Sequence, residues 1–493
     1  MKHPYLNFSI LAGLITGLSA CGGGSSSGTA PGPVTGIGGT GIISVGTITG
    51  FGSIFVNGVE FETNNASIEI DDSAGSQSGL SVGMVVKVEG TVNDDGITGN
   101  ATLVSYDGDL EGPIGSTPTA NADNTAISFS VLGVNVVVNT AGTVFENTSY
   151  GALIQGDMVD VSGFYDANGQ LVARYIKKKT TTFMAGTTEV EAKGTITGLS
   201  GTSFTLSLGS SASISVDAAS ANLSGIPGST LANGQFVEVK GTLASATATT
   251  LTASDIQYED FNSDQDNISL EGIVTDFVSL SSFSINGRPV DASGATLDPA
   301  TLVIANGIDI EAEGPLVNGT LVAARVESRG GKIALHAPVS AAATTSVSLS
   351  LGDGSLNVTI DNRTQMEDSV SGLSPFTAGN IKPGDFLEIE AYQDASGNLI
   401  ASQLKRDNAD KIVLQGILQS FTDIGNGAGS VTILGITFTT TTITQFEDAN
   451  ETPFSPKDAF FSAGVGGSPV DDLVKIEDKQ PADGTADNVE FED

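Results

Sequence analysis

Short stretches of the sequence alternate apolar and polar residues with a period of two. Residues 86–89 (VKVE) and 237–240 (VEVK) are clear examples. Successive side chains of a β-strand point to opposite faces, so this alternation is typical of a strand with one buried and one solvent-facing side. Apolar spacing with a helical period does not extend over a useful length. The pattern therefore predicts an all-β protein.

Turn residues follow the alternating stretches. They occur at residues 93–96 (NDDG), 166–169 (DANG), 318–319 (NG) and 394–398 (DASGN). Glycine and asparagine tolerate the positive φ of tight turns, so each turn is expected to join its strand to an antiparallel partner. A second hairpin is expected earlier in the unit, at residues 53–59 (SIFVNGV) and 282–287 (SFSING).

Three signals recur in the same order along the chain. The first is a seven-residue step bounded by glycine, at 83–90 (GMVVKVEG), 156–163 (GDMVDVSG), 234–241 (GQFVEVKG) and 307–314 (GIDIEAEG), with weaker copies at 384–391 and 471–478. The second is an alanine followed three residues later by an aliphatic residue, as in Ala101/Val104, Ala173/Ile176, Ala253/Ile256, Ala323/Val326, Ala401/Leu404 and Ala486/Val489. The third is a strand start such as residues 110–112 (LEG), 270–272 (LEG) and 414–416 (LQG). These signals predict six duplicated units.

The repeats define the expected organisation of the chain. We predict a signal peptide over 1–20, an acylated cysteine and flexible linker over 21–41, and β repeats over 42–107, 108–180, 188–260, 267–332, 333–410 and 411–493, the last of them divergent.

The size of a unit limits its fold. About five short antiparallel strands in about 70 residues cannot form a large sandwich, but they can close into a small barrel without exposed edges. The order of a long first strand, a hairpin, a connecting loop and two final strands predicts six tandem five-stranded OB-like barrels. The alternative is strand pairing between units in a propeller or solenoid, although a propeller blade is usually shorter, at about 40 to 50 residues. Short linkers predict a semi-rigid string of abutting neighbours.

The spacing between the alanine and the aliphatic residue leaves one question open. In a regular strand, residues three apart point to opposite faces. Either the alanine packs outside the barrel or a β-bulge brings both residues to the same side.

The N-terminus has the features of a processing signal. Lys2 precedes an apolar stretch over residues 5–18, which is short for a membrane span, and residues 18–21 read LSAC. This arrangement resembles the lipobox of bacterial lipoproteins, which implies that Cys21 becomes the acylated N-terminal residue and anchors the protein to a membrane. The alternative is an ordinary buried cysteine. Gly22 stands where an aspartate retains some lipoproteins at the inner membrane, so an outer-membrane location in a Gram-negative bacterium is expected.

The opening over residues 46–59 (GTITGFGSIFVNGV), the glycine-bounded step and the lipobox together resemble an uncharacterised family of bacterial lipoproteins built from repeated domains of unknown function. The resemblance covers residues 40 to 410 well and the last unit poorly. It implies an envelope location and a β-barrel-like domain, and it provides no activity or catalytic residues to transfer.

The composition narrows the possible partners. The 493 residues include 57 acidic and 20 basic side chains, for a net charge of −37, with one cysteine and two histidines. A strongly negative surface repels phosphates, so nucleic acids are not expected partners. One cysteine permits no internal disulfide. The cationic run at 174–179 (RYIKKK) is interpreted as the solvated end of a strand.

An acidic segment between the third and fourth units is the candidate metal site. Its oxygen-bearing residues approximate a calcium-loop spacing, and they are Asp260, Asn262, Asp264, Asp266 and Glu271. Gln265 occupies the place where the loop needs glycine, and a solvated acidic linker is the alternative interpretation. No other cofactor is expected.

His336 is the histidine that would remain after removal of a signal peptide. Its counterparts in other units are Glu111, Lys193, Glu271 and Gln415. A position that accepts all of these residue types is expected on a solvent-facing side of a strand. No catalytic residue is predicted.

We therefore expect a non-enzymatic, lipid-anchored protein that acts as a structural spacer or surface-presenting scaffold. The alternative is a module that binds a cell-surface glycan, a protein or Ca²⁺ through clefts between repeats.

Overall fold

The structure is a computed structural model that describes residues 41–492 of the chain. The exceptions within this range are residues 52, 122, 123, 141, 210, 260, 262–266, 299, 301, 330–332, 394–396, 450, 451, 465, 466 and 471. The described part contains forty strands and five short 3₁₀ helices, so the all-β prediction is confirmed. None of the helices in this part has the length and apolar character needed to cross a membrane.

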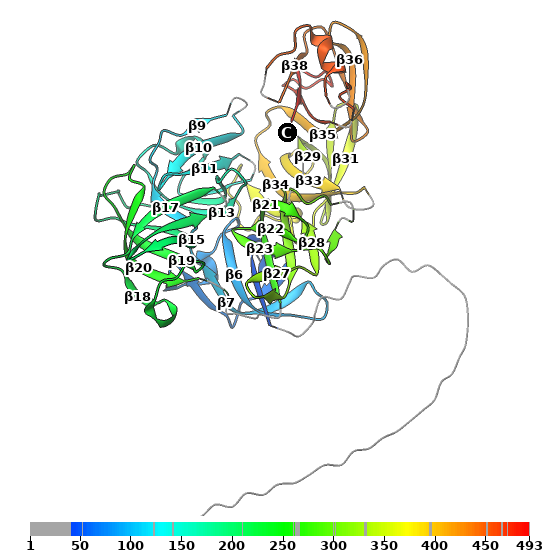
Figure 1. Cartoon of the computed structure of the whole chain (residues 1–493). Coiled ribbons are helices and arrows are strands. Elements are labelled where there is room, and N and C mark those ends of the chain that lie inside the picture. Colours follow the sequence, from blue (N-terminus) through cyan, green and yellow to red (C-terminus); the bar gives the residue numbers. More distant parts are fainter. Residues whose placement is uncertain are drawn as a thin grey trace, which may run out of the picture. The chain divides into compact units, whose positions relative to one another are not determined.

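The first three repeats follow one another in the blue, cyan and green parts of the chain (Figure 1). Repeat 1 contains β1 (Gly41–Phe51), β2 (Ile54–Val56), β3 (Val59–Glu62), β4 (Ser67–Ile70), β5 (Ser73–Ala74), η1 (Gln77–Gly79), β6 (Val85–Val92) and β7 (Thr98–Tyr106). Repeat 2 contains β8 (Leu110–Pro113), β9 (Thr119–Ala120), β10 (Ala126–Val131), β11 (Val134–Asn139), β12 (Val144–Glu146), η2 (Tyr150–Ala152), β13 (Met158–Tyr165) and β14 (Leu171–Lys178). Repeat 3 contains β15 (Glu189–Ser200), β16 (Ser203–Leu208), β17 (Ala212–Asp217), β18 (Asn222–Gly225), η3 (Pro227–Ser229), β19 (Phe236–Leu243) and β20 (Thr250–Tyr258).

Repeats 5 and 6 have the same order of elements as repeat 3, whereas the described residues of repeat 4 include no 3₁₀ helix and an additional short strand, β26. Repeat 4 contains β21 (Ile268–Ser279), β22 (Ser282–Ile285), β23 (Arg288–Asp291), β24 (Thr296–Asp298), β25 (Asp309–Gly314), β26 (Leu316–Val317), β27 (Thr320–Val322) and β28 (Arg325–Ser328). Repeat 5 contains β29 (Ile333–Ala343), β30 (Ser346–Leu351), β31 (Gly354–Thr359), β32 (Gln365–Asp368), η4 (Ala378–Asn380), β33 (Phe386–Gln393) and β34 (Leu399–Asp407). Repeat 6 contains β35 (Ile412–Gly425), β36 (Ala428–Ile433), β37 (Ile436–Thr440), β38 (Gln445–Glu447), η5 (Lys457–Ser462), β39 (Leu473–Asp478) and β40 (Asn488–Phe491).

The strands of repeat 1 close into a five-stranded barrel. Its first strand, β1, pairs antiparallel with β2 and with β6. The ring is completed because β2 pairs with β3, β3 runs parallel to β7, and β7 pairs with β6. Repeats 3 and 5 close through the equivalent pairs. This is the OB-like barrel that the sequence predicts.

Every repeat also contains a short strand in the loop that precedes its fourth barrel strand. These strands are β4, β12, β18, β24, β32 and β38, and each runs parallel to the last strand of its own repeat. With only three or four residues each, they are too short to display an alternation. The sequence predicted a plain loop here for that reason.

A β-bulge accounts for the alanine spacing. In repeat 1, Gly90 pairs with Ala101, and Glu89 pairs with Leu103, so the intervening Thr102 has no opposite residue. The bulge turns both Ala101 and Val104 toward the core, where they are buried. A Cβ atom on Gly90 would lie 2.2 Å from the carbonyl oxygen of Asn100, which explains the second glycine of the step. The same shift occurs in repeats 2, 3 and 5.

The first glycine of the step has a different role. Its φ angle is positive in repeats 1 to 5, at 88°, 94°, 91°, 87° and 93° for Gly83, Gly156, Gly234, Gly307 and Gly384. Residues with a Cβ atom rarely adopt this conformation, so glycine is needed where the chain enters the fourth barrel strand.

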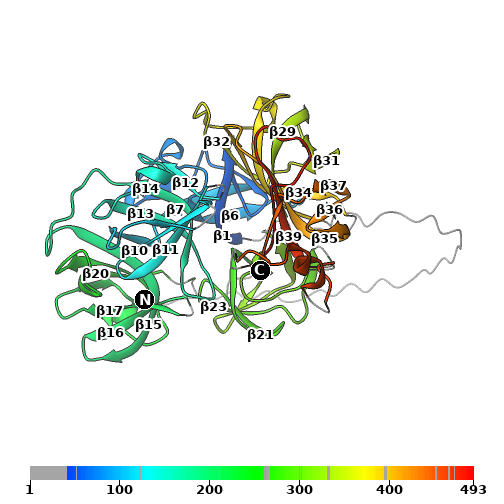
Figure 2. The ribbon, with the colours of Figure 1, turned by 90° about the horizontal axis from the view of Figure 1, so that it is seen from above.

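The first strand of each repeat also pairs with the first strand of another repeat. Strands β8 and β15 pair antiparallel and join repeats 2 and 3, and β29 and β35 join repeats 5 and 6 in the same way. Strand β1 pairs parallel with β21 and joins repeats 1 and 4; both strands are labelled in Figure 2. The result is three sheets of 15, 13 and 12 strands. The predicted string of sequence neighbours is therefore wrong, because repeat 1 pairs with repeat 4.

The apolar cores reflect this pairing. The buried apolar residues of repeats 2 and 3 form one cluster, and those of repeats 5 and 6 form another. Repeats 1 and 4 have separate clusters, although Ile43 of β1 packs into the cluster of repeat 4.

Candidate functional site

Most residues of the two sites predicted from sequence lie outside the described part. These are Cys21 and the acidic residues Asp260, Asn262, Asp264 and Asp266. Glu271 is described, and its side chain is directed toward repeat 1, where it accepts hydrogen bonds from the Thr47 backbone N–H (2.7 Å) and hydroxyl (3.2 Å). Among the residues with described positions, no group of three histidine, cysteine or acidic side chains is arranged to hold a metal ion. The calcium site stays a prediction.

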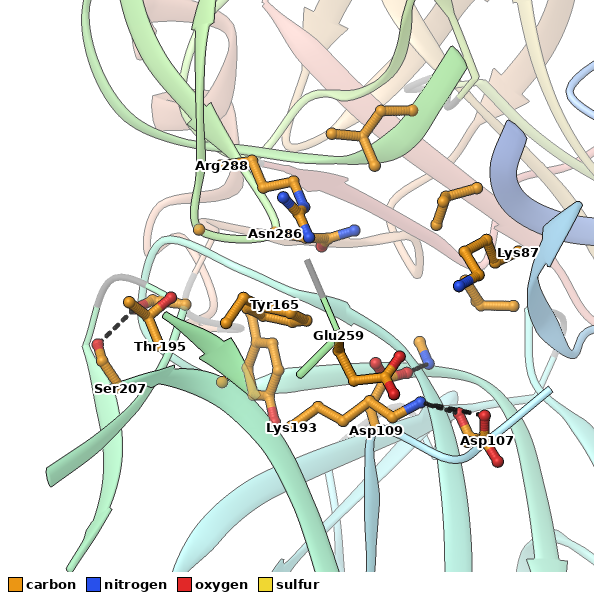
Figure 3. Close-up of a pocket in the computed structure, with 18 of the residues that line it drawn as sticks. Lys87, Asp107, Asp109, Tyr165, Lys193, Thr195, Ser207, Glu259, Asn286 and Arg288 are labelled. Atoms are coloured by element: carbon orange, nitrogen blue, oxygen red, sulfur yellow. Dashed lines mark hydrogen bonds and ion pairs between the residues drawn. The ribbon is translucent and has the colours of Figure 1, made fainter. Parts of the chain in front are cut away.

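The main candidate site is a cavity of about 290 Å³ that repeats 1, 2, 3 and 4 enclose together (Figure 3). Its apolar lining includes Val45, Val85, Tyr165, Phe236, Phe261 and Leu270. Its charged lining consists of Lys87, Asp107, Asp109, Lys193, Glu259, Asp276 and Arg288. A concave, mostly apolar site with a few charged groups is the usual form of a small-molecule pocket.

One end of the cavity holds a group of charged side chains. Lys193 of β15 donates to the carbonyl oxygen of Asp107 (3.1 Å), and its Nζ lies 3.7 Å from the Asp107 carboxylate. Asp109 accepts a hydrogen bond from the Gly163 backbone N–H (2.9 Å). Figure 3 shows Asp109, Glu259 and Lys193 close together. This end therefore gathers residues from the link between repeats 1 and 2, from repeat 3, and from the segment that leaves β20.

Burial affects the protonation of these groups. Burial raises the pKa of Asp109, and Lys193 only partly opposes that effect. Burial also raises the pKa of Glu259, against the opposing influence of Lys193 and Lys87. Burial alone would lower the pKa of Lys193, but the nearby Asp107 and Glu259 raise it above its ordinary value. Lys193 is thus a cation at neutral pH, and this single positive charge faces the carboxyl groups of Asp107, Asp109 and Glu259.

Arg288 forms the opposite side of the cavity. It is the first residue of β23, and its guanidinium carbon lies 4.0 Å from the ring centroid of Phe261 and 4.9 Å from that of Phe236. Such cation–π stacking holds the arginine and the two rings together. Figure 3 shows Arg288 and Asn286 across the cavity from Lys193 and Glu259.

Tyr165 of β13 contributes an unsatisfied donor to the wall. The residue is 6% exposed. Its hydroxyl group is buried and has no hydrogen-bond partner among the described groups. Burial, together with the nearby Asp109, raises the pKa of this phenol well above its ordinary value, so it stays protonated. A buried phenol without an acceptor is costly, and the hydroxyl oxygen is covered by protein and not open to the cavity.

A second cavity, of about 350 Å³, lies between repeats 2, 5 and 6 and contains His336. Lys411, Lys475, Glu477 and Glu490 also line it. Burial and the nearby lysines lower the pKa of His336 to about 4, so the imidazole is neutral at pH 7. The expectation of a solvent-facing histidine is wrong, since the side chain is half-buried against neighbouring repeats.

Polar residues of four repeats meet in a small central junction around β1 and β21. Arg329 pairs with Glu311 and Glu327, Arg174 of repeat 2 pairs with Asp309, and Arg363 of repeat 5 pairs with Glu327. Burial, with Asp309 close by, raises the pKa of Glu271 to about 7. The side chains of Arg329, Glu311 and Glu327 are less than 10% exposed. These ion pairs connect the three barrel pairs to one another.

The cationic run at 174–179 also differs from its prediction. Lys177 bonds to Glu146 (2.8 Å), Lys178 to Asp157 (2.8 Å) and Lys179 to Glu111 (2.7 Å), while Arg174 is buried in the central junction. The run is ion-paired along β14 and is not simply a solvated strand end.

The sequence did contain one signal for the cavities. The middle position of the recurring strand start holds Glu111, Lys193, Glu271, His336 and Gln415 in five repeats. Lys193 lines the first cavity, His336 and Gln415 line the second, and Glu271 lies in the central junction. The position varies because each copy faces a different neighbouring repeat.

Comparison with protein families agrees with the repeat structure. A family model described as a domain of unknown function, DUF5666, matches the chain six times, and the matches cover more than half of it. They span residues 32–104, 111–177, 193–257, 271–327, 336–405 and 415–488. No curated protein matches the chain. The chain therefore belongs to the DUF5666 family and carries six copies of its domain.

Proposed function

We propose that this protein is a non-catalytic scaffold of the bacterial envelope, held to a membrane by a lipid on Cys21. The observation that supports a scaffold is the joining of first strands between repeats, which links the six barrels into three pairs. Buried ion pairs then link the pairs to one another. Such a body resists deformation better than a string of independent domains, which suits a spacer or a surface-presenting role.

The membrane anchor is supported by the sequence around Cys21. Small residues precede this cysteine, and the segment after it is rich in glycine, serine and threonine, which favours a flexible tether. Two or three acyl chains give stable anchoring. The net charge of −37 disfavours contact between the barrels and an anionic leaflet. The outer membrane of a Gram-negative bacterium is the proposed location.

Expression of the full chain in a Gram-negative host with an alkyne-labelled fatty acid tests this proposal. The wild-type protein should incorporate the label and sediment with outer membranes, whereas the Cys21→Ser variant should remain unlabelled. The proposed anchor is contradicted if the wild-type protein does not incorporate the label, or if the Cys21→Ser variant still does.

The cavity between repeats 1 to 4 supports a second function, as a binding module that uses inter-repeat clefts. The observation that supports this function is that four repeats enclose a cavity of about 290 Å³ with an apolar wall and buried charged groups. A surface that served only as a spacer has no need of a buried, under-neutralised cavity. Thermal melts during titration with Ca²⁺, with Mg²⁺ as the control, test the calcium form of this function. A rise in melting temperature specific to Ca²⁺ supports it, and an unchanged melting temperature contradicts it.

A further inference from the structure

We propose that the cavity between repeats 1 to 4 binds a small organic cation, a primary amine attached to an apolar body. This inference rests on the binding function proposed above and specifies its ligand class. Its two supports are the charge at one end of the cavity and the apolar and aromatic surface of the rest of the lining.

The charged end favours a cation. Asp107, Asp109 and Glu259 line it together with one lysine, Lys193, which already bonds to Asp107. Glu238 is almost fully buried behind the lining, 3.8 Å from the Nζ of Lys193 and 3.5 Å from that of Lys240. Acidic groups therefore outnumber the cation within this end of the cavity. An added ammonium group would lie among carboxylates that burial has deprived of water.

The two remaining cations of the lining differ in their relation to the charged end. Arg288 is stacked against Phe261 and Phe236 on the far side of the cavity. Lys87 of β6 lies 3.7 Å from Glu89 of the same strand, its side chain is 30% exposed, and it also acts on Glu259, whose pKa it lowers. Even with Lys87 counted, the three carboxylates of the charged end outnumber its two lysines.

Tyr165 adds aromatic surface to the cavity. Its side chain is more than nine-tenths buried and lines the cavity. The hydroxyl oxygen is covered by protein, so the carbon atoms of Tyr165 form this part of the lining. An aromatic face attracts a cation.

The rest of the lining indicates the size and apolar character of the ligand body. Val45 of repeat 1, Phe236 of repeat 3 and Leu270 of repeat 4 line the cavity away from the carboxylates. The volume of about 290 Å³ is at the small end of the range of ligand pockets, about 300–1,000 Å³. An aryl or short alkyl amine is the class of molecule that matches these dimensions.

Isothermal titration of the purified full chain in a non-ionic detergent tests the proposal with three probes of one shape. These are 2-phenylethylamine, 2-phenylethanol and 3-phenylpropionate. The amine should bind at least about tenfold more tightly than the alcohol, and the carboxylate should bind least. Tighter binding of the carboxylate than of the amine overturns the proposal.

Variants locate the site. Glu259→Gln and Asp109→Asn should each weaken the binding of the amine by about tenfold and change the affinity for the alcohol little. Asp94→Asn, in the exposed turn between β6 and β7, is the matched loss of a carboxylate and should have no effect. Thermal melts identify variants that fail to fold. Two cavity variants are used because one that folds is enough to test the site. Unchanged amine affinity in a folded cavity variant rejects the proposed site.

The outcomes separate the cation proposal from the binding function. If the alcohol binds as tightly as the amine and Tyr165→Phe or Glu259→Gln alters both, the cavity binds ligands but the cation class is wrong. If none of the probes binds up to about 10 mM, both the cation class and small-molecule binding at this cavity are rejected.

Discussion

The junction between repeats 2 and 3 and the junction between repeats 1 and 4 use the same strand of the barrel with different chemistry. In the first, Leu110 of β8 stands opposite Ala192 of β15, both side chains are fully buried, and one apolar cluster continues through both barrels. In the second, Ser44 of β1 stands opposite Ser269 of β21, and the amide of Asn57 donates to both hydroxyl groups (3.0 and 2.6 Å).

The difference corresponds to distance along the chain. Repeats 2 and 3 are consecutive, so a non-directional apolar contact is sufficient to join them. Repeats 1 and 4 are separated by two barrels, and their junction uses directional hydrogen bonds from Thr47 and Asn57 to residues of β21, next to the buried ion pairs of the central junction. A buried polar network of this kind adds specificity, and it becomes costly when one member is lost. We therefore expect the two junctions to respond differently to mutation and to pH.

The largest effect is expected at the buried ion pairs of repeat 4 in the central junction. Arg329→Met removes the partner of Glu311 and Glu327, whose side chains are less than 10% exposed. Loss of one member of a buried pair costs about 3–5 kcal/mol, because the remaining charges stay buried. Urea denaturation measures this loss. The double variant Arg329→Met/Glu311→Gln should recover part of it, and a loss below about 1 kcal/mol in the single variant contradicts a buried network.

A smaller effect is expected at the apolar junction of repeats 5 and 6. Leu335 of β29 stands opposite Leu414 of β35, and both are fully buried. Leu335→Ala should lower the free energy of unfolding by about 2–4 kcal/mol through lost burial and a residual cavity. Unlike that of Arg329→Met, this loss should be the same at pH 5.5 and pH 8. A strong pH dependence would show that charges control this junction too.

The pH dependence of stability separates the two junctions further. Burial raises the folded-state pKa of Glu271 to about 7, whereas an unfolded glutamate titrates near pH 4.3. The folded chain thus binds this proton more tightly, so the contribution favours folding at low pH and is lost as the pH rises through 7.

Glu271→Gln imitates the protonated carboxyl and should flatten the pH profile between pH 5 and 8, by about 2–3 kcal/mol. Denaturation curves of wild type and variant at matched pH values provide the comparison. Parallel profiles for the two proteins argue against a titrating Glu271.

The smallest effect is expected for an ion pair at the surface. Lys177 and Glu146 lie 2.8 Å apart, and each side chain is 33% exposed. Water and salt screen such a pair, so Lys177→Met should change the free energy of unfolding by less than about 1 kcal/mol. A loss as large as that of Arg329→Met would remove the distinction between exposed and buried pairs.

The sequence predicted the barrel well because the barrel depends on local signals. The period-two alternation identified strands such as β6 and β19, and Gly83 and Gly90 marked a positive φ angle and a close backbone approach. Sequence could not predict which barrels pair. That choice depends on outward-facing residues such as Ser44 and Ser269, which are far apart in the chain and appear as ordinary solvated positions.

The same limit applies to the candidate site. Lys193 and Glu259 belong to different elements of repeat 3, and Asp109 comes from the link between two other repeats. No spacing along the chain relates them, because the association of four barrels brings them together. Variation at the position of Lys193 and His336 was the available signal, and it was interpreted as solvent exposure.

The pairing of repeat 1 with repeat 4 is the central claim, and a cysteine cross-link tests it most directly. Ser44 and Ser269 bond the same amide nitrogen of Asn57, so sulfur atoms at both positions can meet. A chain with Cys21→Ser, Ser44→Cys and Ser269→Cys, exported to an oxidising periplasm, should contain a disulfide-linked peptide pair from one molecule, detected by mass spectrometry. A folded variant in which both thiols stay free, or in which residue 44 links only between molecules, contradicts the account.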